Sequence, residues 1–367
     1  MFFLWTLIPA LYVVARFVLL LPLPLMVRLV IALLVLAGSE FHLISRLTFG
    51  SMFSPEWPQW VMMALGWLFG CVLLLACLLI LRDLAAVVSR LALGRPLPFL
   101  PTVLPLLLLA GGLAAWGVRQ ATVVPEVRTV NVTLEGLPAA FEGYRIIQLS
   151  DIHASSLLTG EWVAKVVERT NARKADLIVL TGDMSDGYVP VRREDVASLG
   201  QLAAKDGIYA ITGNHEYYFN YAEWMQAWST LGIPFLLNSH VRLYRDAHSI
   251  VIAGVTDEKD LTNPPNVSNA LAGTQPDDSV ILLDHRPGNA RENARHHVKL
   301  QLSGHTHGGM IRVLEFAIKP ANNGFVSGRY QVGGMQLYVS NGTGLWNGFP
   351  LRIGRPSEIT ELILHRQ

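Results

Sequence analysis

The stretch YRIIQLSDIH, residues 144–153, is a short apolar run that ends in a carboxylate and an imidazole. A second stretch of the same design, LIVLTGDMSDG (177–187), follows it, and residues 160–173 between them have the apolar spacing of an amphipathic helix. Further apolar runs lie at 207–212, 250–255, 279–283, 299–302 and 336–340. Strands that alternate with helices predict an α/β domain whose sheets are covered by helices.

Polar clusters follow five of these apolar runs, where the strands are expected to end. The clusters are Asp151-Ile152-His153, Gly182-Asp183, Gly213-Asn214-His215-Glu216, Asp284-His285 and Gly304-His305-Thr306-His307. In an extended chain, side chains at i and i+2 point to the same side, so the first and last clusters can each offer two ligands. The glycines are expected to turn the backbone sharply before the side chains that follow them.

The residue types in these clusters predict a metal site. Carboxylate, imidazole and amide oxygen suit borderline divalent metals such as Mn, Fe or Zn, and these clusters contain no cysteine to favour a softer ion. Each cluster alone is more often a turn or a surface feature. Because all five occur in this order at strand ends, we interpret them together as one site.

The first 120 residues differ in composition from the rest. Of the 367 residues, 51% are hydrophobic and only 16% are charged, against about 25% charged in soluble domains. Four apolar stretches before residue 120 are long enough for a helix of about 20 residues that crosses a bilayer. We predict spans at 2–21, 27–44, 60–81 and 97–118, with Pro98, Pro101 and Pro105 delaying or bending the last one.

This composition predicts the division of the chain. Residues 1–120 are expected to form a multi-pass membrane anchor, residues 121–143 a linker with the first strand, and residues 144–367 the soluble domain. The stretch 82–94 either lies along the membrane surface or continues the third helix. A formal net charge of +1 gives no support for nucleic-acid binding.

Arginines flank the predicted spans unevenly. One side has five, namely Arg16, Arg28, Arg82, Arg90 and Arg95, and the other has Arg46, Arg119 and Arg128. Because cytoplasmic loops carry the excess of Lys and Arg, the richer side is assigned to the cytoplasm. The predicted location is the cell (inner) membrane. Four spans then place both termini and the soluble domain outside the cytoplasm, whereas one span more or fewer would place the soluble domain inside it.

The motif order DIH, GD, GNHE, DH and GHTH resembles the calcineurin-like metallophosphoesterase superfamily, from about residue 144 to the chain end. The segments LTGDMSDG, GNHEYY and SGHTHGG are most similar to one branch of this superfamily. That branch contains the YkuE- and YaeI-like phosphodiesterases and the transmembrane proteins with a metallophosphoesterase domain. The resemblance implies a four-layer α/β/β/α sandwich, two sheets between helical layers, with two divalent metal ions at the strand ends.

The resemblance also implies roles for the motif residues. One metal would be held by Asp151, His153 and His307, the other by Asn214, His285 and His305, and Asp183 would bridge both. His215 would contact the substrate phosphate and protonate the leaving oxygen. Two metals about 3.5–4 Å apart can activate a bridging water and neutralise developing charge, and an imidazole can act as general acid near neutral pH.

Three further residues are candidate substrate ligands. Asn341 stands where similar proteins often have an arginine, and Arg352 matches a later family arginine that could compensate for it. Arg286 can bind a phosphate oxygen, although a solvated loop arginine is the alternative. We interpret Asp186 and Glu216 as residues that orient the imidazoles. The aromatic stretches 217–224 and 346–350 are either core packing or apolar walls beside a substrate or the membrane.

The sequence therefore predicts a membrane-anchored two-metal phosphoesterase that hydrolyses a phosphodiester or pyrophosphate by a metal-activated hydroxide. Tethering raises the local concentration of a bilayer substrate, which favours a lipid-linked one. The alternatives are a UDP-2,3-diacylglucosamine-type pyrophosphatase of lipid A synthesis, whose cytoplasmic substrate conflicts with the predicted topology, and a non-catalytic scaffold. Expected partners are the phosphoester and the bilayer. Substrate, metal, monoester or diester preference and oligomeric state stay open.

Overall fold

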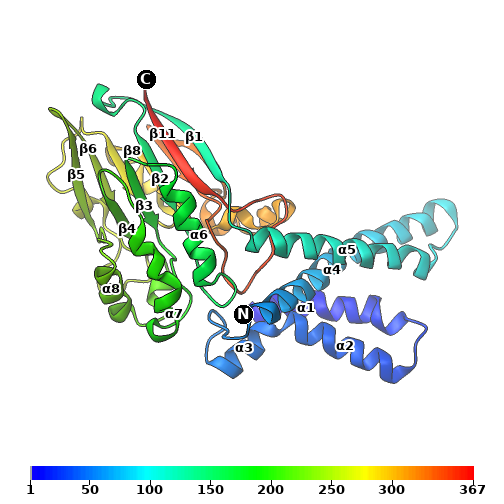
Figure 1. The fold of residues 1–367 in the computed structure, drawn as a ribbon. Helices are drawn as coiled ribbons and strands as arrows, with labels where there is room; N and C mark the ends of the chain where they lie inside the picture. The colour runs from blue at the N-terminus through cyan, green and yellow to red at the C-terminus, as the bar shows by residue number, and fades with distance from the viewer. Residues whose placement is uncertain (1) are drawn as a thin grey trace. The chain divides into compact units, whose positions relative to one another are not determined.

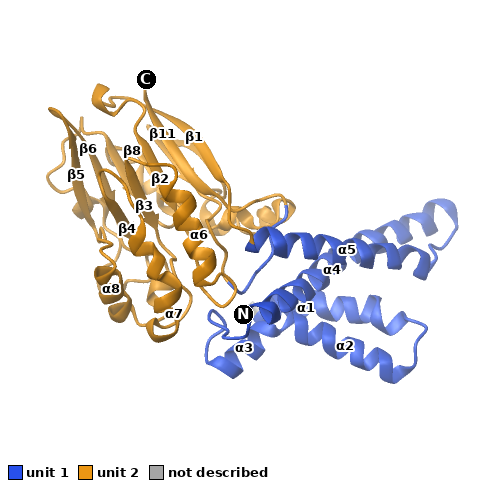
Figure 2. Cartoon of the chain, in the orientation of Figure 1, with its two compact units in different colours: residues 1–122, 347–353 blue, residues 123–346, 354–367 orange. Residues whose placement is uncertain are grey.

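The computed structural model describes residues 2–367, which form two compact units (Figures 1 and 2). The helical unit is the chain up to Thr122 together with Asn347–Ile353, and the sheet unit is Val123–Trp346 with Gly354–Gln367. The chain therefore passes between the two units three times. The sequence prediction placed the short segment Asn347–Ile353 in the soluble domain, whereas in the structure it belongs to the helical unit.

The helical unit contains five α-helices. They are α1 (Phe2–Arg16), α2 (Leu25–Ser39), α3 (Phe41–Phe49), α4 (Gln59–Leu93) and α5 (Phe99–Thr122). Three helical segments are long and apolar enough to cross a membrane, or four if α2 and α3, which meet at 66°, count as one bent span. The predicted four spans correspond to the larger number.

Two details of these helices resolve open points. Helix α4 continues to Leu93, so residues 82–93 extend the third predicted span and do not form a separate surface helix. Helix α5 begins directly after Pro98 and contains Pro105. Proline lacks the N–H that a helix interior needs, so Pro98 sets the start of the helix.

Segment Asn347–Ile353 packs among these helices. Leu351 lies close to Gly70 and Gly117, where an added Cβ would come within 3.1 Å and 2.5 Å of its Cδ1 atom. The Arg352 backbone N–H donates to the Gly117 carbonyl at 3.0 Å, and His42 Nε2 contacts the Gly348 carbonyl oxygen. Of the alternatives for the aromatic loop 346–350, packing within the protein is the one seen for these residues.

The sheet unit contains two mixed sheets (Figure 1). The five-stranded sheet has the order β1-β11-β2-β3-β4, with β1 (Val127–Leu134), β11 (Ile359–Arg366), β2 (Arg145–Leu149), β3 (Leu177–Thr181) and β4 (Ile208–Ile211). The six-stranded sheet has the order β5-β6-β7-β8-β10-β9. Its strands are β5 (Ser239–Arg245), β6 (His248–Gly254), β7 (Val280–Leu283), β8 (Val298–Ser303), β10 (Met335–Val339) and β9 (Gly328–Val332).

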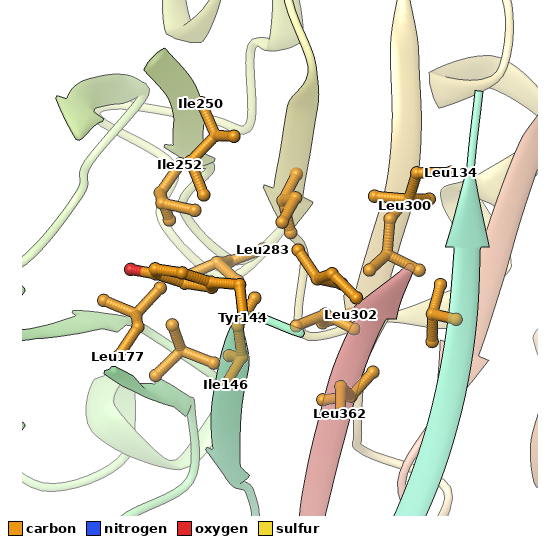
Figure 3. Packing of buried hydrophobic residues seen from close by; sticks show 14 of the residues in the cluster. Leu134, Tyr144, Ile146, Leu177, Ile250, Ile252, Leu283, Leu300, Leu302 and Leu362 are labelled. Atoms are coloured by element: carbon orange, nitrogen blue, oxygen red, sulfur yellow. The ribbon is translucent and has the colours of Figure 1, made fainter. Parts of the chain in front are cut away.

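The two sheets pack face to face over a hydrophobic core. Ile146 and Leu177 of one sheet and Ile252, Leu283 and Leu302 of the other belong to the same buried cluster (Figure 3). Strands buried on both faces are expected to be nearly continuous apolar runs, as β3 and β7 are. The strands predicted from the apolar runs are confirmed, with ends that differ by at most two residues.

Helices cover the outer faces of both sheets. Helix α6 (Gly160–Asn171) lies along β2 and β3 and buries Trp162, Val163, Val166 and Val167 (Figure 1). Helices α7 (Val189–Val196) and α8 (Tyr221–Thr230) follow, and a second buried cluster joins the six-stranded sheet to the short helices α9 (Val267–Ala270) and α10 (Ala290–Asn293). The predicted α/β/β/α layering is confirmed.

Candidate metal centre

The predicted ligands lie in loops at the carboxyl ends of five strands. Asp151, Asp183 and Asn214 follow β2, β3 and β4 of one sheet, and His285 and His305 follow β7 and β8 of the other. Loops at the carboxyl ends of parallel strands are the usual place for ligand binding in α/β sheets. Backbone hydrogen bonds join the first two loops, because Asp151 N donates to Gly182 O and His153 N to Asp183 O, both at 3.0 Å.

The backbone is unusual at these positions. Five predicted ligands have φ between 48° and 68°: Asp151, His153, Asp183, His305 and His307. Such values are uncommon outside glycine and cost on the order of 1–3 kcal/mol each, which is why they gather at functional sites. The expected extended i, i+2 geometry is therefore wrong, although both pairs still converge on one place.

The glycines before the ligands have two different roles. Gly182 has a φ of 89°, as a sharp turn requires. Gly304 instead allows close approach, since an added Cβ would lie 1.9 Å from Ser150 Oγ and 2.2 Å from Asp151 Oδ2. Gly213 is similar, with Asp183 Oδ1 only 2.3 Å from such an atom. A sharp turn was predicted at all three glycines. At Gly213 and Gly304, the reason for glycine is instead the close approach of neighbouring side chains.

The first group of possible ligands is Asp151, His153 and His307, whose ligand atoms lie within 4.8 Å of one another. His153 Nε2 is 3.3 Å from His307 Nε2, which in turn is 3.5 Å from Asp151 Oδ1. Two nitrogens bound at 2.0–2.1 Å to one tetrahedral ion would be about 3.4 Å apart. The spacing of the two imidazoles fits a shared metal ion.

The second group is Asp183, His285 and His305. Asp183 Oδ2 is 3.2 Å from His285 Nε2 and 3.8 Å from His153 Nε2, so the same carboxylate oxygen faces both groups. Asn214 is 6% exposed, and its Oδ1 accepts no hydrogen bond from any residue that the structure describes. Buried acceptors are normally paired, so this orphaned oxygen fits a metal ligand.

Hydrogen bonds orient three of the imidazoles. Asp186 Oδ1 lies 3.0 Å from His153 Nδ1 and 2.6 Å from His215 Nδ1. The His285 Nδ1–H donates to the Thr181 carbonyl at 2.8 Å. A hydrogen bond at Nδ1 leaves Nε2 as the coordinating nitrogen, as is usual for metal-binding histidines. The interpretation of Asp186 as an orienting residue agrees with these contacts.

Glu216 has a different role from the one expected. Its carboxylate accepts hydrogen bonds from the backbone N–H groups of Gly213 (2.6 Å), Met184 (2.8 Å) and Asp183 (2.9 Å). It contacts backbone amides and so joins the loops after β3 and β4, rather than orienting an imidazole. Such charge-assisted hydrogen bonds are stronger than neutral ones.

Burial and nearby charges shift the pKa values of the site residues in opposite directions. Burial would raise the pKa of Asp183, but the imidazoles of His285 and His215 hold this pKa well below its usual range. Burial would lower the pKa of His215, but the carboxylates of Asp186 and Asp183 raise it to about 9. The site therefore favours an ionised Asp183 and a proton on His215 at neutral pH.

Comparison with known proteins identifies the family. Residues 144–309 match the model of the calcineurin-like phosphoesterase family. A relative from Bacillus subtilis, named metallophosphoesterase YkuE, is 31% identical over 65% of this chain and 85% of its own length. The chain belongs to the calcineurin-like metallophosphoesterase family. The family uses a dinuclear divalent metal centre, and the two ligand groups of this metallophosphoesterase fit one.

Two other relatives are named as transmembrane proteins. A protein of Danio rerio named transmembrane protein with metallophosphoesterase domain is 35% identical over 72% of this chain, and its counterpart from Bos taurus is 37% identical over 69%. This chain spans 63% and 60% of their lengths. The predicted resemblance is confirmed down to this branch.

One predicted substrate ligand of the metallophosphoesterase lies beside the metal site. Arg286 Nη1 is 3.2 Å from His305 Nε2, while Nε and Nη2 donate to the two oxygens of Asp257 at 2.6 Å and 3.2 Å. The Asp257 side chain is fully buried and the Arg286 side chain is 20% exposed. The alternative of a solvated loop arginine is therefore wrong. Asp257 was not predicted, because a single aspartate after β6 has no motif around it.

The other two predicted substrate ligands have structural contacts. The Asn341 amide accepts from Ser327 Oγ at 2.6 Å and donates to the Pro356 carbonyl and the Glu358 carboxylate at 3.2 Å and 3.3 Å. Arg352 is buried in the helical unit. These contacts give no support to substrate binding by either residue in this metallophosphoesterase. By contrast, the Trp346 ring lies 6.5 Å from the His215 ring, a neighbour that the sequence did not indicate.

Proposed function

We propose that this chain is a metal-dependent phosphoesterase that hydrolyses a phosphodiester or pyrophosphate. The observation that carries the proposal is the position of Asp183, whose Oδ2 lies between His285 of one ligand group and His153 of the other. Asp151, His153 and His307 would hold one ion, and Asn214, His285 and His305 the other. When bound, such a metal pair supplies positive charge and an activated water for in-line attack on phosphorus.

His215 is proposed as the general acid. Its Nδ1 is hydrogen-bonded to Asp186, so Nε2 is the nitrogen that would deliver a proton to the leaving oxygen. Asp186 also bonds His153, and it therefore fixes the acid relative to a metal ligand. An acid positioned in this way typically contributes 10²–10⁴-fold to the rate.

Arg286 is proposed to bind a non-bridging oxygen of the substrate. Two of its nitrogens are fixed by Asp257, and the third, Nη1, lies beside His305. Guanidinium groups bind phosphate oxygens with charge-assisted hydrogen bonds. A fixed cation next to the metal ligands suits the negative charge on the non-bridging oxygens of a phosphodiester or pyrophosphate.

A membrane location and a lipid-linked substrate are part of the proposal. The support is the set of helices long and apolar enough to span a bilayer, together with relatives named transmembrane proteins. The uneven arginines further favour a phosphoesterase domain outside the cytoplasm. A tethered enzyme meets a bilayer substrate at a higher local concentration.

The test is Asp183→Asn in the full chain, purified in mild detergent. We expect two metal ions per chain in the wild type by elemental mass spectrometry and about one or fewer in the variant. Hydrolysis of bis(p-nitrophenyl) phosphate should fall by at least 10³-fold, because loss of the bridge removes the paired metals. The matched control is Asp277→Asn at an exposed carboxylate.

A correctly folded Asp183→Asn protein with unchanged hydrolysis would exclude the proposed site. A wild type that binds two metals but hydrolyses neither diesters nor pyrophosphates would support the scaffold alternative instead.

A further inference from the structure

The helical unit contains an apolar cavity of about 640 Å³. Residues from both helical hairpins line it, including Val13 of α1, Val35 of α2, Leu75 of α4 and Leu107 of α5. The Trp67 indole N–H at its wall already donates to the Gly111 carbonyl at 3.0 Å. The cavity therefore offers an occupant no strong hydrogen bond, and a hydrocarbon is the chemistry that it fits.

Two adjacent glycines of α5 leave this space open. An added Cβ at Gly112 would have no atom within 4 Å, and one at Gly111 would meet only Trp67 Cζ2 at 3.9 Å. Gly117 of the same helix differs, since its close neighbour Leu351 excludes a side chain. Glycine in a helix costs about 1 kcal/mol relative to alanine, so the pair at 111–112 reduces helix stability without allowing closer packing.

The cavity is elongated along two helices. Its wall follows nine residues of α4 (67–75) and nine of α5 (104–112), which is about 12 Å at 1.5 Å per residue. A wall of this length and apolar character can lie along part of an extended acyl chain.

The surroundings identify the source of the hydrocarbon. The lining helices are long and apolar enough to cross a bilayer. On α5, Leu104 and Leu108 belong to the cavity wall and are 47% and 77% exposed, so the cavity opens to the outside of the helical unit. In a bilayer, lipid acyl chains are the hydrocarbon at that surface.

We propose that this cavity binds an acyl chain of a membrane phospholipid, held between the α1/α2 and α4/α5 hairpins. The proposal rests on the placement of these helices in a bilayer and is independent of the phosphoesterase function. A bound chain would replace the missing side chains at 111–112 and fill the contact between the hairpins, where an empty cavity would forfeit dispersion contacts.

The test uses the full chain in nanodiscs that contain phosphatidylcholine with a photoactivatable diazirine on one acyl chain. Crosslinks should concentrate on peptides that include residues 67–75 and 104–112. Gly112→Leu fills the cavity and should reduce crosslinking there at least fivefold. The matched control, Ala115→Leu, places the same side chain at an exposed position of α5 that does not line the cavity, and it should crosslink like the wild type.

A second filling variant, Leu104→Trp, protects the test against a folding failure of Gly112→Leu, because this position is half-exposed. Equal melting temperatures confirm that the proteins compared are folded. Crosslinks spread evenly over all exposed helix faces, or unchanged in both filling variants, would overturn the proposal. Displacement of the probe by a co-purified protein on this face would overturn it as well.

Discussion

At the scale of single residues, the site combines strained backbone with dense hydrogen bonding. Left-handed φ values at five predicted ligands persist because neighbouring groups hold them, as Glu216 does for the loop that carries Asp183. The strained backbone therefore needs these hydrogen bonds. Without them the ligand loops could relax, and the ligand side chains would no longer converge on one place.

Arg286 gives a prediction about substrate binding. We expect Arg286→Lys to raise KM for a diester about tenfold, or about 1.4 kcal/mol, with a smaller change in kcat, because lysine loses the two-point contact with Asp257. Asp257→Asn should act in the same direction. Steady-state kinetics on both variants and on the double variant provide the measurement.

If the two residues act as one unit, the double variant will resemble the single variants. The control is Arg295→Lys, an arginine whose side chain is 75% exposed. Independent, additive effects on KM would show that Asp257 does not position Arg286.

Gly304 gives a prediction about packing at the site. Gly304→Ala should lower the melting temperature and halve the metal content or more, because the new Cβ would collide with Ser150 Oγ and Asp151 Oδ2. Gly334→Ala is the control, since its Cβ would meet nothing within 4 Å. Thermal unfolding and elemental analysis measure the two effects, and wild-type metal content in Gly304→Ala would contradict the close approach.

At the scale of secondary-structure elements, Glu361 of β11 connects three neighbours. Its buried carboxylate forms ion pairs with Arg145 of β2 and with Arg173, which follows α6, and accepts from Thr129 Oγ1 of β1 at 2.9 Å. Burial would raise the pKa of Glu361, but these two arginines hold it below its usual range. One ionised side chain thus joins β11 to both neighbouring strands and to the residue after α6.

We expect Glu361→Gln to destabilise the sheet unit at pH 7 by about 2 kcal/mol, below the 3–5 kcal/mol for fully buried pairs because both arginines are partly exposed. That corresponds to about 4–8 °C in Tm. The folded pKa lies below the unfolded value of about 4.3, so the stabilisation is present above that pH and disappears as pH falls through the folded pKa. Melting curves from pH 7 to 3 should converge, and a constant difference would argue against an electrostatic origin.

The same elements show what could be predicted from sequence. Strands β2, β3 and β7 are mostly apolar and were found, whereas β1 and β5 alternate or expose much of their surface and carry a weak local signal. The pairing of β1 with β11 joins residues about 230 positions apart, such as Val127 with Ile359, and no local pattern encodes it.

The residues of the site also fall into those that the sequence could indicate and those that it could not. The metal ligands stand in short motifs, so their order along the chain could be recognised. Asp257 and its partner Arg286 are 29 positions apart, and each is an ordinary loop residue until the fold brings them together. Left-handed backbone at Asp151 and His153 also has no sequence signal, because it is imposed by the neighbouring loop after β3.

At the scale of the whole molecule, the bent pair α2–α3 decides the predicted orientation. If this pair counts as one span there are four spans, and if it does not there are three. With four, both termini lie on one side of the membrane. We expect alkaline phosphatase fused after Gln367 to be active and a green fluorescent reporter at the same place to be dark. The reverse result would indicate three or another odd number of spans and a cytoplasmic phosphoesterase domain.

Segment Asn347–Ile353 has a consequence for the life of the protein in a cell. Many tethered enzymes can be shed by one proteolytic cut in the stalk. Here a cut between α5 and β1 would leave two further chain connections, on either side of this segment. The residues just before it, Thr343 and Gly344, bond the backbone of Ser150 and Asp151 at 2.7 Å and 2.9 Å. Release of a soluble form would therefore require three cuts, one of them close to the metal ligands, so proteolytic shedding of the sheet unit is disfavoured.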